Sequence, residues 1–289
     1  MNRVTLNSFA KVNLYLDILS TRTDGYHLLE MVNAKISLHD EITCSLTGTP
    51  GIQLTISDRR IPTGPENTAW RAADLFFRTI QDDQGVEIEI QKRVPFGAGL
   101  GGGSANAAAV LKALNQIYNE VLSTQQLIDI GAKIGADVPF FIVEGCCHVR
   151  GIGEIIEPVN RNSEKDDPVY LVLCSPEVEV STGVAYRLWD ESKEKVHGSS
   201  LPILSALQDG RIEVLHQCLF NSFEAVIYPA FPELETIYRR FSSISPTKPL
   251  LSGSGSNLFS LHRTEAEAEE VCAGLQGEGY QAGVYHLIL

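Results

Sequence analysis

Five glycines fall within seven positions, at residues 97, 99, 101, 102 and 103, inside the segment from Pro95 to Ala105. Glycine weakens helices and strands, so this density indicates a backbone with left-handed conformations or very close approach to another group. An alternating segment at residues 86–90 precedes the loop, and an Ala-rich segment follows, which predicts a strand, a loop and a helix. Backbone amides at a helix start attract anions, so phosphate is the expected ligand. A flexible turn is the alternative.

Two known phosphate-binding motifs match this loop only in part. Gly97, Gly99 and Gly102 fit the GxGxxG pattern of dinucleotide-binding proteins, which would make the protein a nicotinamide oxidoreductase. That alternative requires a strand at residues 120–126, where the sequence predicts the start of a helix instead. A Walker A loop ends in Gly-Lys-Ser/Thr, and no lysine precedes Ser104. The loop therefore belongs to a third kind.

The composition argues against several partners and structural features, namely nucleic acid, a membrane span, a protein metal site and disulfides. The formal net charge is −13, and nucleic-acid binding relies on Lys and Arg, so nucleic acid is not an expected partner. No segment reaches the roughly 18 to 20 unbroken apolar residues of a membrane span, so a cytoplasmic protein without membrane association is expected. The six cysteines show no CxxC pair, and carboxylates form no cluster, so no protein metal site and no disulfide are predicted.

Apolar periodicity predicts strands and helices along the chain. Residues 9–19 alternate, which predicts a half-buried strand with Lys11 and Asn13 on its polar face. A turn at residues 23–25 and a returning strand at 32–38 follow. Further strands are predicted at residues 86–90, 169–174 and 284–289, and helices at 67–80, 106–118, 123–135, 221–226, 233–241 and 265–275.

The order of these elements predicts the fold class. Strands and helices do not alternate regularly, and hairpin signals occur near residues 24–25 and 151–153, so an α+β fold is expected rather than a doubly wound sheet. The polar run at residues 160–167, followed by Pro168, is the predicted linker. The expected domains are therefore residues 1–160 and 161–289.

Three motifs in this order resemble those of the GHMP kinases, a superfamily of ATP-dependent small-molecule kinases. They are the strand with Ala10 to Asn13, the glycine loop, and a second glycine loop at residues 251–255. The resemblance implies a two-domain fold, with an N-terminal ATP-binding α/β domain and a C-terminal ferredoxin-like α+β domain. It also implies ATP with Mg²⁺, the ion held by phosphates and water. Two positions depart from the family pattern: Ala105 replaces a common second serine, and Asn257 stands where Thr or Val is usual.

The resemblance also implies which residues bind ATP and which carry catalysis. The implied ATP-binding residues are Pro95, Phe96, Gly97, Ala98, Gly99, Leu100, Gly101, Gly102, Gly103, Ser104, Ala105, Asn67 and Lys92. Lys11 and Asp137 match the catalytic pair, in which the aspartate accepts the hydroxyl proton and the lysine stabilises developing charge. Without the resemblance, Asp137 is read as a turn or cap residue and Lys11 as a solvated strand lysine.

The substrate is implied by segments at residues 11–14, 24–27 and 135–141. They are similar to those of GHMP kinases whose alcohol substrate carries a cytidine diphosphate group. Tyr26 and Tyr186 would then stack on the cytosine, His27 would read its edge, and Asn13 would hold the alcohol near Lys11. Without the resemblance, Tyr26 and His27 are read as hairpin packing.

Several alternatives stay open at this point. One is a GHMP kinase that acts on mevalonate, homoserine or a sugar, and another is a non-catalytic nucleotide-binding regulator. A bacterial source is expected because the sequence shows no plastid transit segment. Both a monomer and a homodimer are compatible with the sequence.

Overall fold

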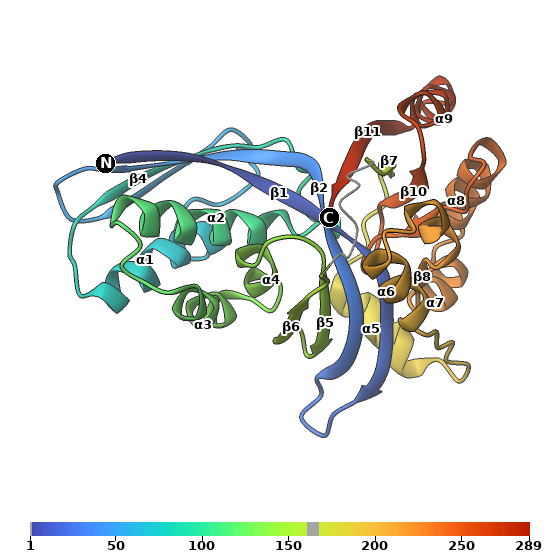
Figure 1. The fold of residues 1–289 in the computed structure, drawn as a ribbon, viewed down its shortest axis with the longest axis horizontal. Helices are drawn as coiled ribbons and strands as arrows, with labels where there is room; N and C mark the ends of the chain where they lie inside the picture. The colour runs from blue at the N-terminus through green and yellow to red at the C-terminus, as the bar shows by residue number, and fades with distance from the viewer. Residues whose placement is uncertain (1, 161–167) are drawn as a thin grey trace. The chain divides into compact units, whose positions relative to one another are not determined.

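The computed structural model describes residues 2–160 and 168–289, and Figure 1 shows its fold. These residues form two compact units, each made of several stretches of the chain. The first unit contains residues 2–10, Leu38–Phe96 and Gly101–Glu144. The second contains Lys11–Ser37, Gly97–Leu100 and the described residues from 145 onwards. Residues 161–167 of the predicted linker lie outside the described residues, so the domain boundary there stays a prediction.

The first unit combines a small sheet with helices (Figure 1). Strand β2 (His27–Leu46) pairs antiparallel with β4 (Val86–Gln91), which pairs in parallel with β3 (Ile52–Ile56). The helices are α1 (Thr68–Ile80), α2 (Gly102–Ile117), α3 (Thr124–Ile134) and α4 (Val138–Ile142). Alanines and phenylalanines form the buried stripe of α1, as the apolar spacing predicted. The Ala-rich α2 is buried along most of its length and packs against α1.

The second unit contains the later part of strand β1 (Arg3–Thr21) and the earlier part of β2. The two strands are joined by a turn in which Gly25 has a φ of 88°. The other strands are β5 (Cys147–Gly151), β6 (Ile155–Pro158), β7 (Tyr170–Ser175), β8 (Phe220–Asn221), β9 (Leu250–Leu251), β10 (Leu258–His262) and β11 (Gln281–Ile288). The antiparallel order runs from β2 through β11, β7 and β10 to β9. Strand β2 also pairs with β5, which pairs with β6.

Helices complete the second unit. They are α5 (Thr182–Glu191), α6 (Leu201–Gln208), the 3₁₀ helix η1 (Ile212–Gln217), α7 (Glu224–Ala230), α8 (Pro232–Ile244) and α9 (Glu265–Gly277). Helix α9 connects β10 to β11 and packs on the strands β7, β10 and β11. This order of strands and helices, together with the first unit, confirms the predicted α+β class.

The burial of strand β1 differs from the prediction. The strand predicted at residues 9–19 exists, but it is not half buried, because Lys11, Asn13 and Asp17 on its polar face are at most 5% exposed. The interpretation of Lys11 as a solvated lysine is therefore wrong. A buried ammonium group needs polar partners, and the alternating pattern alone did not reveal them.

Other differences concern where elements begin. Helix α2 starts at Gly102 instead of residue 106, so the last glycines of the loop form its first turn. The helix predicted from residue 221 starts at Glu224, because Phe220 and Asn221 pair with β1. Helix α5 was not predicted, since it buries only Ala185 and Trp189 and so lacks a clear apolar stripe.

Two further observations concern membrane-spanning helices and the cysteines. In the part of the chain that the structure describes, no helix is long and apolar enough to cross a membrane. All six cysteines are free thiols, and five of them are buried. Burial raises the pKa of the Cys44 thiol to about 12, which makes this thiol unreactive near neutral pH.

The capping box of α3 gives a test of the local sequence signals. Ser123 Oγ accepts a hydrogen bond from Gln126 N at 3.3 Å, and Gln126 Oε1 accepts one from Ser123 N at 2.9 Å. Ser123→Ala is expected to lower the free energy of unfolding by about 1 kcal/mol, because an amide at the helix start loses its acceptor. Urea denaturation followed by circular dichroism measures the loss. The exposed Ser199 provides the control, and a Ser123→Ala loss no larger than that of Ser199→Ala would contradict the capping role.

Candidate active site

Every second residue at the start of the glycine loop has a left-handed backbone. The φ angles are 72° at Gly97, 71° at Gly99 and 69° at Gly101. Residues with a Cβ rarely adopt such angles, which explains glycine at these three positions. Gly101 is the N-cap of α2, and no side chain caps this end. The first amides of this helix of 16 residues are therefore available to an anion, and the helix dipole favours one there.

The start of α2 is fixed by close packing in the first unit. A Cβ on Gly102 would lie 3.1 Å from Val94 Cγ1, so the helix start lies tightly against the chain that precedes the loop. Gly103 O accepts a hydrogen bond of 2.7 Å from Thr68 Oγ1 at the start of α1. These contacts hold the amide-bearing turn in place before any ligand binds.

Asp137 belongs to a segment that begins near this turn in the first unit. It occupies the N-cap position of α4, but its side chain makes no capping hydrogen bond and is half-buried. A Cβ on Gly135 would lie 3.9 Å from Ser104 Oγ in the first turn of α2. The segment that carries Asp137 therefore begins beside the helix N-terminus. The structure thus places the start of this segment beside a helix end that no side chain caps.

An open hollow of about 370 Å³ lies where the chain enters the glycine loop. It is lined by Ser57, Asp58, Arg59, Arg60, Lys92, Arg93, Val94 and Pro95. Four of these residues are basic. Asp58 is bound by Arg60, with Oδ2 2.6 Å from Nη2, and this hydrogen bond holds the pKa of Asp58 at about 2. The hollow thus collects positive charge on an otherwise acidic chain.

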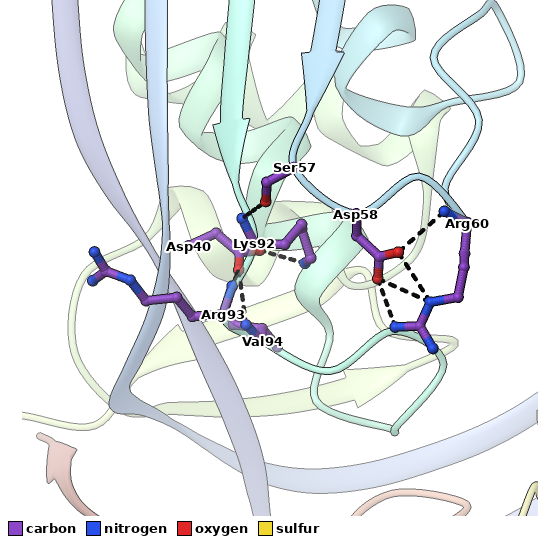
Figure 2. Close-up of polar contacts among 7 residues, drawn as sticks. All are labelled: Asp40, Ser57, Asp58, Arg60, Lys92, Arg93 and Val94. Atoms are coloured by element: carbon purple, nitrogen blue, oxygen red, sulfur yellow. Dashed lines mark hydrogen bonds and ion pairs between the residues drawn. The ribbon is translucent and has the colours of Figure 1, made fainter.

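Asp40 binds residues that line this hollow, and Figure 2 shows these contacts. Its fully buried carboxylate accepts hydrogen bonds from Arg93 N at 2.7 Å, Val94 N at 2.8 Å and Lys92 Nζ at 2.5 Å. Ser57 Oγ accepts from Lys92 N at 2.8 Å. One carboxylate therefore fixes three consecutive residues ahead of the loop. The sequence analysis missed Asp40, although an aspartate inside an apolar strand was a signal that could have indicated it.

The two residues outside the loop that were predicted to bind ATP both have partners in the first unit. Asn67 caps α1, since its Oδ1 accepts from Ala69 N at 2.8 Å and its Nδ2 donates to Pro62 O at 2.7 Å. Lys92 pairs with Asp40, and its side chain is 8% exposed. Their predicted contacts with ATP stay predictions.

In the second unit, Lys11 belongs to a chain of buried polar side chains. Lys11 Nζ donates to Asn13 Oδ1 at 2.6 Å, and Asn13 Nδ2 donates to Asn33 Oδ1 at 2.6 Å. Lys11, Asn13 and Asn33 are at most 5% exposed. The structure therefore brings together the predicted residues Lys11 and Asn13, and it adds Asn33, which the sequence analysis missed. Asp137 belongs to the first unit, so its pairing with Lys11 stays a prediction.

The residues predicted to bind a nucleobase lie on the hairpin and on α5. The rings of His27 and Tyr186 stack with centroids 4.4 Å apart and an interplanar angle of 23°. His27 Nε2 lies 2.9 Å from Asp190 Oδ1, and this contact lowers the pKa of Asp190. Tyr26 is 60% exposed. The structure thus joins His27 with Tyr186 and leaves Tyr26 at the surface. Asp190 was missed, because its partner is distant in the sequence.

Comparison with known proteins identifies the family. Residues 67–145 match the family described as GHMP kinases N terminal domain, and residues 203–281 match GHMP kinases C terminal. A relative from Clostridium acetobutylicum, named 4-diphosphocytidyl-2-C-methyl-D-erythritol kinase, is 37% identical over 92% of this chain and 94% of its own length. The chain belongs to the GHMP kinase family. It is therefore an ATP-dependent small-molecule kinase, as the three motifs predicted.

Two further GHMP kinases extend the comparison. A relative of the same name from Alkaliphilus metalliredigens is 37% identical over 95% of this chain and 93% of its own length. The crystal structure of 4-(cytidine 5'-diphospho)-2C-methyl-D-erythritol kinase is 32% identical and covers 99% of this chain, with a TM-score of 0.83 and all of that chain matched. The oxidoreductase alternative is wrong, because a capped helix begins at Thr124 where it requires a strand.

The buried ion pair at the hollow can be tested by substitution. Asp40→Asn is expected to lower the free energy of unfolding by roughly 3 kcal/mol, because Lys92 would keep a buried charge without its partner. Urea denaturation measures the loss. The double variant Asp40→Asn with Lys92→Met is the control, and it should recover part of the loss because both charges are gone. A single variant as stable as the original protein would rule out the ion pair as a determinant of stability.

Proposed function

We propose that this kinase transfers the γ-phosphate of ATP to the 2-hydroxyl of 4-diphosphocytidyl-2-C-methyl-D-erythritol, a step of the non-mevalonate route to isoprenoid precursors. The observation that carries the proposal is the likeness, over nearly the whole chain, to kinases that bear this substrate's name. The stacked pair of His27 and Tyr186 supports it, because it offers aromatic faces and a polar ring edge to a nucleobase. Since the relatives are bacterial, we place the reaction in a bacterial cytoplasm.

ATP binds, in this proposal, along the glycine loop from Pro95 to Ala105. The amides at the start of α2 receive its phosphates, and the basic hollow beside Lys92 supports its other end. Among the described residues, no three His, Cys, Asp or Glu side chains are grouped to hold a metal ion. In this proposal Mg²⁺ would be held by phosphate oxygens of ATP and by water, and it would supply positive charge to the phosphates.

Catalysis rests on Asp137 and Lys11 in this proposal. Asp137 carries a carboxylate that caps no helix amide, so it can orient the hydroxyl of the alcohol and accept its proton. Lys11 supplies positive charge to the transferring phosphoryl group, and its hydrogen bond to Asn13 orients the ammonium group. Asn13 holds the alcohol beside Lys11. Phosphoryl transfer needs mainly positioning and charge stabilisation, which these residues provide.

The cytosine end of the substrate lies between Tyr26 and Tyr186 and is read by His27. When the Nε2 hydrogen of His27 is donated to Asp190, Nδ1 is left as an acceptor. An acceptor suits the 4-amino group of cytosine and is unsuited to the 4-carbonyl of uracil. The exposed ring of Tyr26 is available to cover the other face of the base.

A kinase that acts on mevalonate, homoserine or a sugar is the second candidate, and a panel assay separates the two. The purified protein is incubated with ATP and each alcohol in turn, and ADP release is measured. Activity confined to the cytidine diphosphate alcohol supports the proposal. Activity only on another alcohol would overturn the proposed substrate. The proposed binding of ATP at the glycine loop would then still stand. If no alcohol in the panel leads to ADP release, a nucleotide-binding regulator would be favoured.

Asp137→Asn is expected to reduce kcat by at least ~10²-fold, because the amide cannot accept the hydroxyl proton. ATP affinity, measured by calorimetry with a non-hydrolysable analogue, should change little. Asp129→Asn on the exposed side of α3 is the matched control and should keep its kcat. A near-normal kcat in Asp137→Asn would remove Asp137 from the catalytic role.

Base recognition can be tested by competition. Cytidine diphosphate should inhibit competitively against the alcohol, and uridine diphosphate should inhibit about tenfold less, because mismatched polar groups stay unpaired. Tyr26→Ala should raise KM for the alcohol about tenfold or more and leave KM for ATP unchanged, since stacking contributes about 1 to 3 kcal/mol per base. Tyr280→Ala is the control. Equal inhibition by both nucleotides, with an unchanged KM in Tyr26→Ala, would point to a different alcohol.

A further inference from the structure

Asn257, the residue that departs from the family pattern, connects the two glycine loops within the second unit. Its side chain is 1% exposed, and its Nδ2 donates a hydrogen bond to Ala98 O in the first loop. Its backbone oxygen accepts a hydrogen bond of 2.8 Å from Ser252 N, which closes the second loop at residues 251–255. One buried residue therefore closes one glycine loop with its backbone oxygen and binds the other with its side-chain amide.

The two loops lie so close together that the first loop has no room for a side chain at residue 99. A Cβ on Gly99 would lie 2.9 Å from Ser252 O and 3.1 Å from Gly255 O. On the other side, Lys11 N donates to Leu100 O at 3.0 Å. Residues 97–100 are thus held between strand β1 and the second glycine loop.

The second glycine loop is itself anchored. Asn221 Nδ2 donates to Leu251 O at 2.7 Å and to Gly253 O at 2.8 Å. Asn221 Oδ1 accepts from Phe223 N at 3.0 Å, which fixes the orientation of the amide. Asn257 therefore binds the first loop to a rigid partner.

We propose that Asn257 is a positioning residue, which holds residues 97–100 in the shape that receives the phosphates of ATP. Glycine-rich backbone loses more conformational freedom on ordering than other backbone. A loop that is already held loses less freedom when ATP binds, so the hydrogen bond to Ala98 O raises ATP affinity. The inference rests on the proposed role of the loop in ATP binding, and it does not depend on which alcohol is the substrate.

The test compares Asn257→Leu with a matched control in the full chain. Asn115→Leu removes another buried asparagine, whose side chain binds Leu122 N and Leu122 O in the first unit. Calorimetry with a non-hydrolysable ATP analogue needs no alcohol, so its result stands whatever substrate is found. Amide hydrogen exchange of residues 97–100 measures the loop directly. Asn257→Val, which carries a residue usual in the family at this position, serves if the leucine variant does not fold.

Asn257→Leu should weaken binding of the analogue about tenfold, which corresponds to about 1.4 kcal/mol. Exchange of the amides at residues 97–100 should become faster in this variant, whereas Asn115→Leu should lose stability and keep both analogue affinity and loop exchange. Unchanged affinity in a folded Asn257 variant would overturn the proposal. An equal loss of affinity in Asn115→Leu would also overturn it, because the effect would then follow from stability alone.

Discussion

A chain with a formal net charge of −13 that binds a nucleoside triphosphate must gather positive potential at one place. The first unit does this with a helix end and a few side chains. The amides at the start of α2 are uncapped, and Lys92, Arg93, Arg59 and Arg60 line the hollow at the entrance to the loop. Backbone amides carry no net charge, so they offer hydrogen bonds to phosphate without mutual repulsion between cations. The glycine density follows from this constraint, because amides can converge on a ligand only where no side chain intervenes.

A glycine-rich backbone does not hold a fixed shape by itself, so buried polar side chains have to hold it. Asp40 performs this task in the first unit through the amides of Arg93 and Val94. Asn257 performs it in the second unit through Ala98 O. Both side chains are almost fully buried, where a hydrogen bond competes little with water. The ordering cost of the loop is thus met during folding, when many other contacts form, and not during nucleotide binding.

The parts of the fold that the sequence predicted well are those set by local chemistry. Ser123 caps α3 where a capping box was predicted, and α1 begins next to Asn67, where the apolar period predicted its start. The hairpin turn at Gly25 and the α+β class followed equally from short segments. Long-range burial did not follow, because the alternation in β1 indicates two faces and does not reveal that elements distant in the sequence cover both. The alternative reading of Lys11 as a solvated lysine, made without the resemblance, was wrong for this reason.

The residues of the candidate site also fall into two groups, those that local motifs indicated and those that act through distant partners. Glycine spacing and the strand and helix around it indicated a phosphate loop, and the three motifs indicated the family. Asp40, Asn33, Asp190 and Asn257 act through partners that are distant in the sequence or on neighbouring strands, so no single motif contains them. Asn257 is instructive, since its departure from the family pattern was visible in the sequence while its meaning was not. A substitution of this kind gains a function only when the fold places an acceptor such as Ala98 O opposite it, and that placement is a property of the tertiary structure.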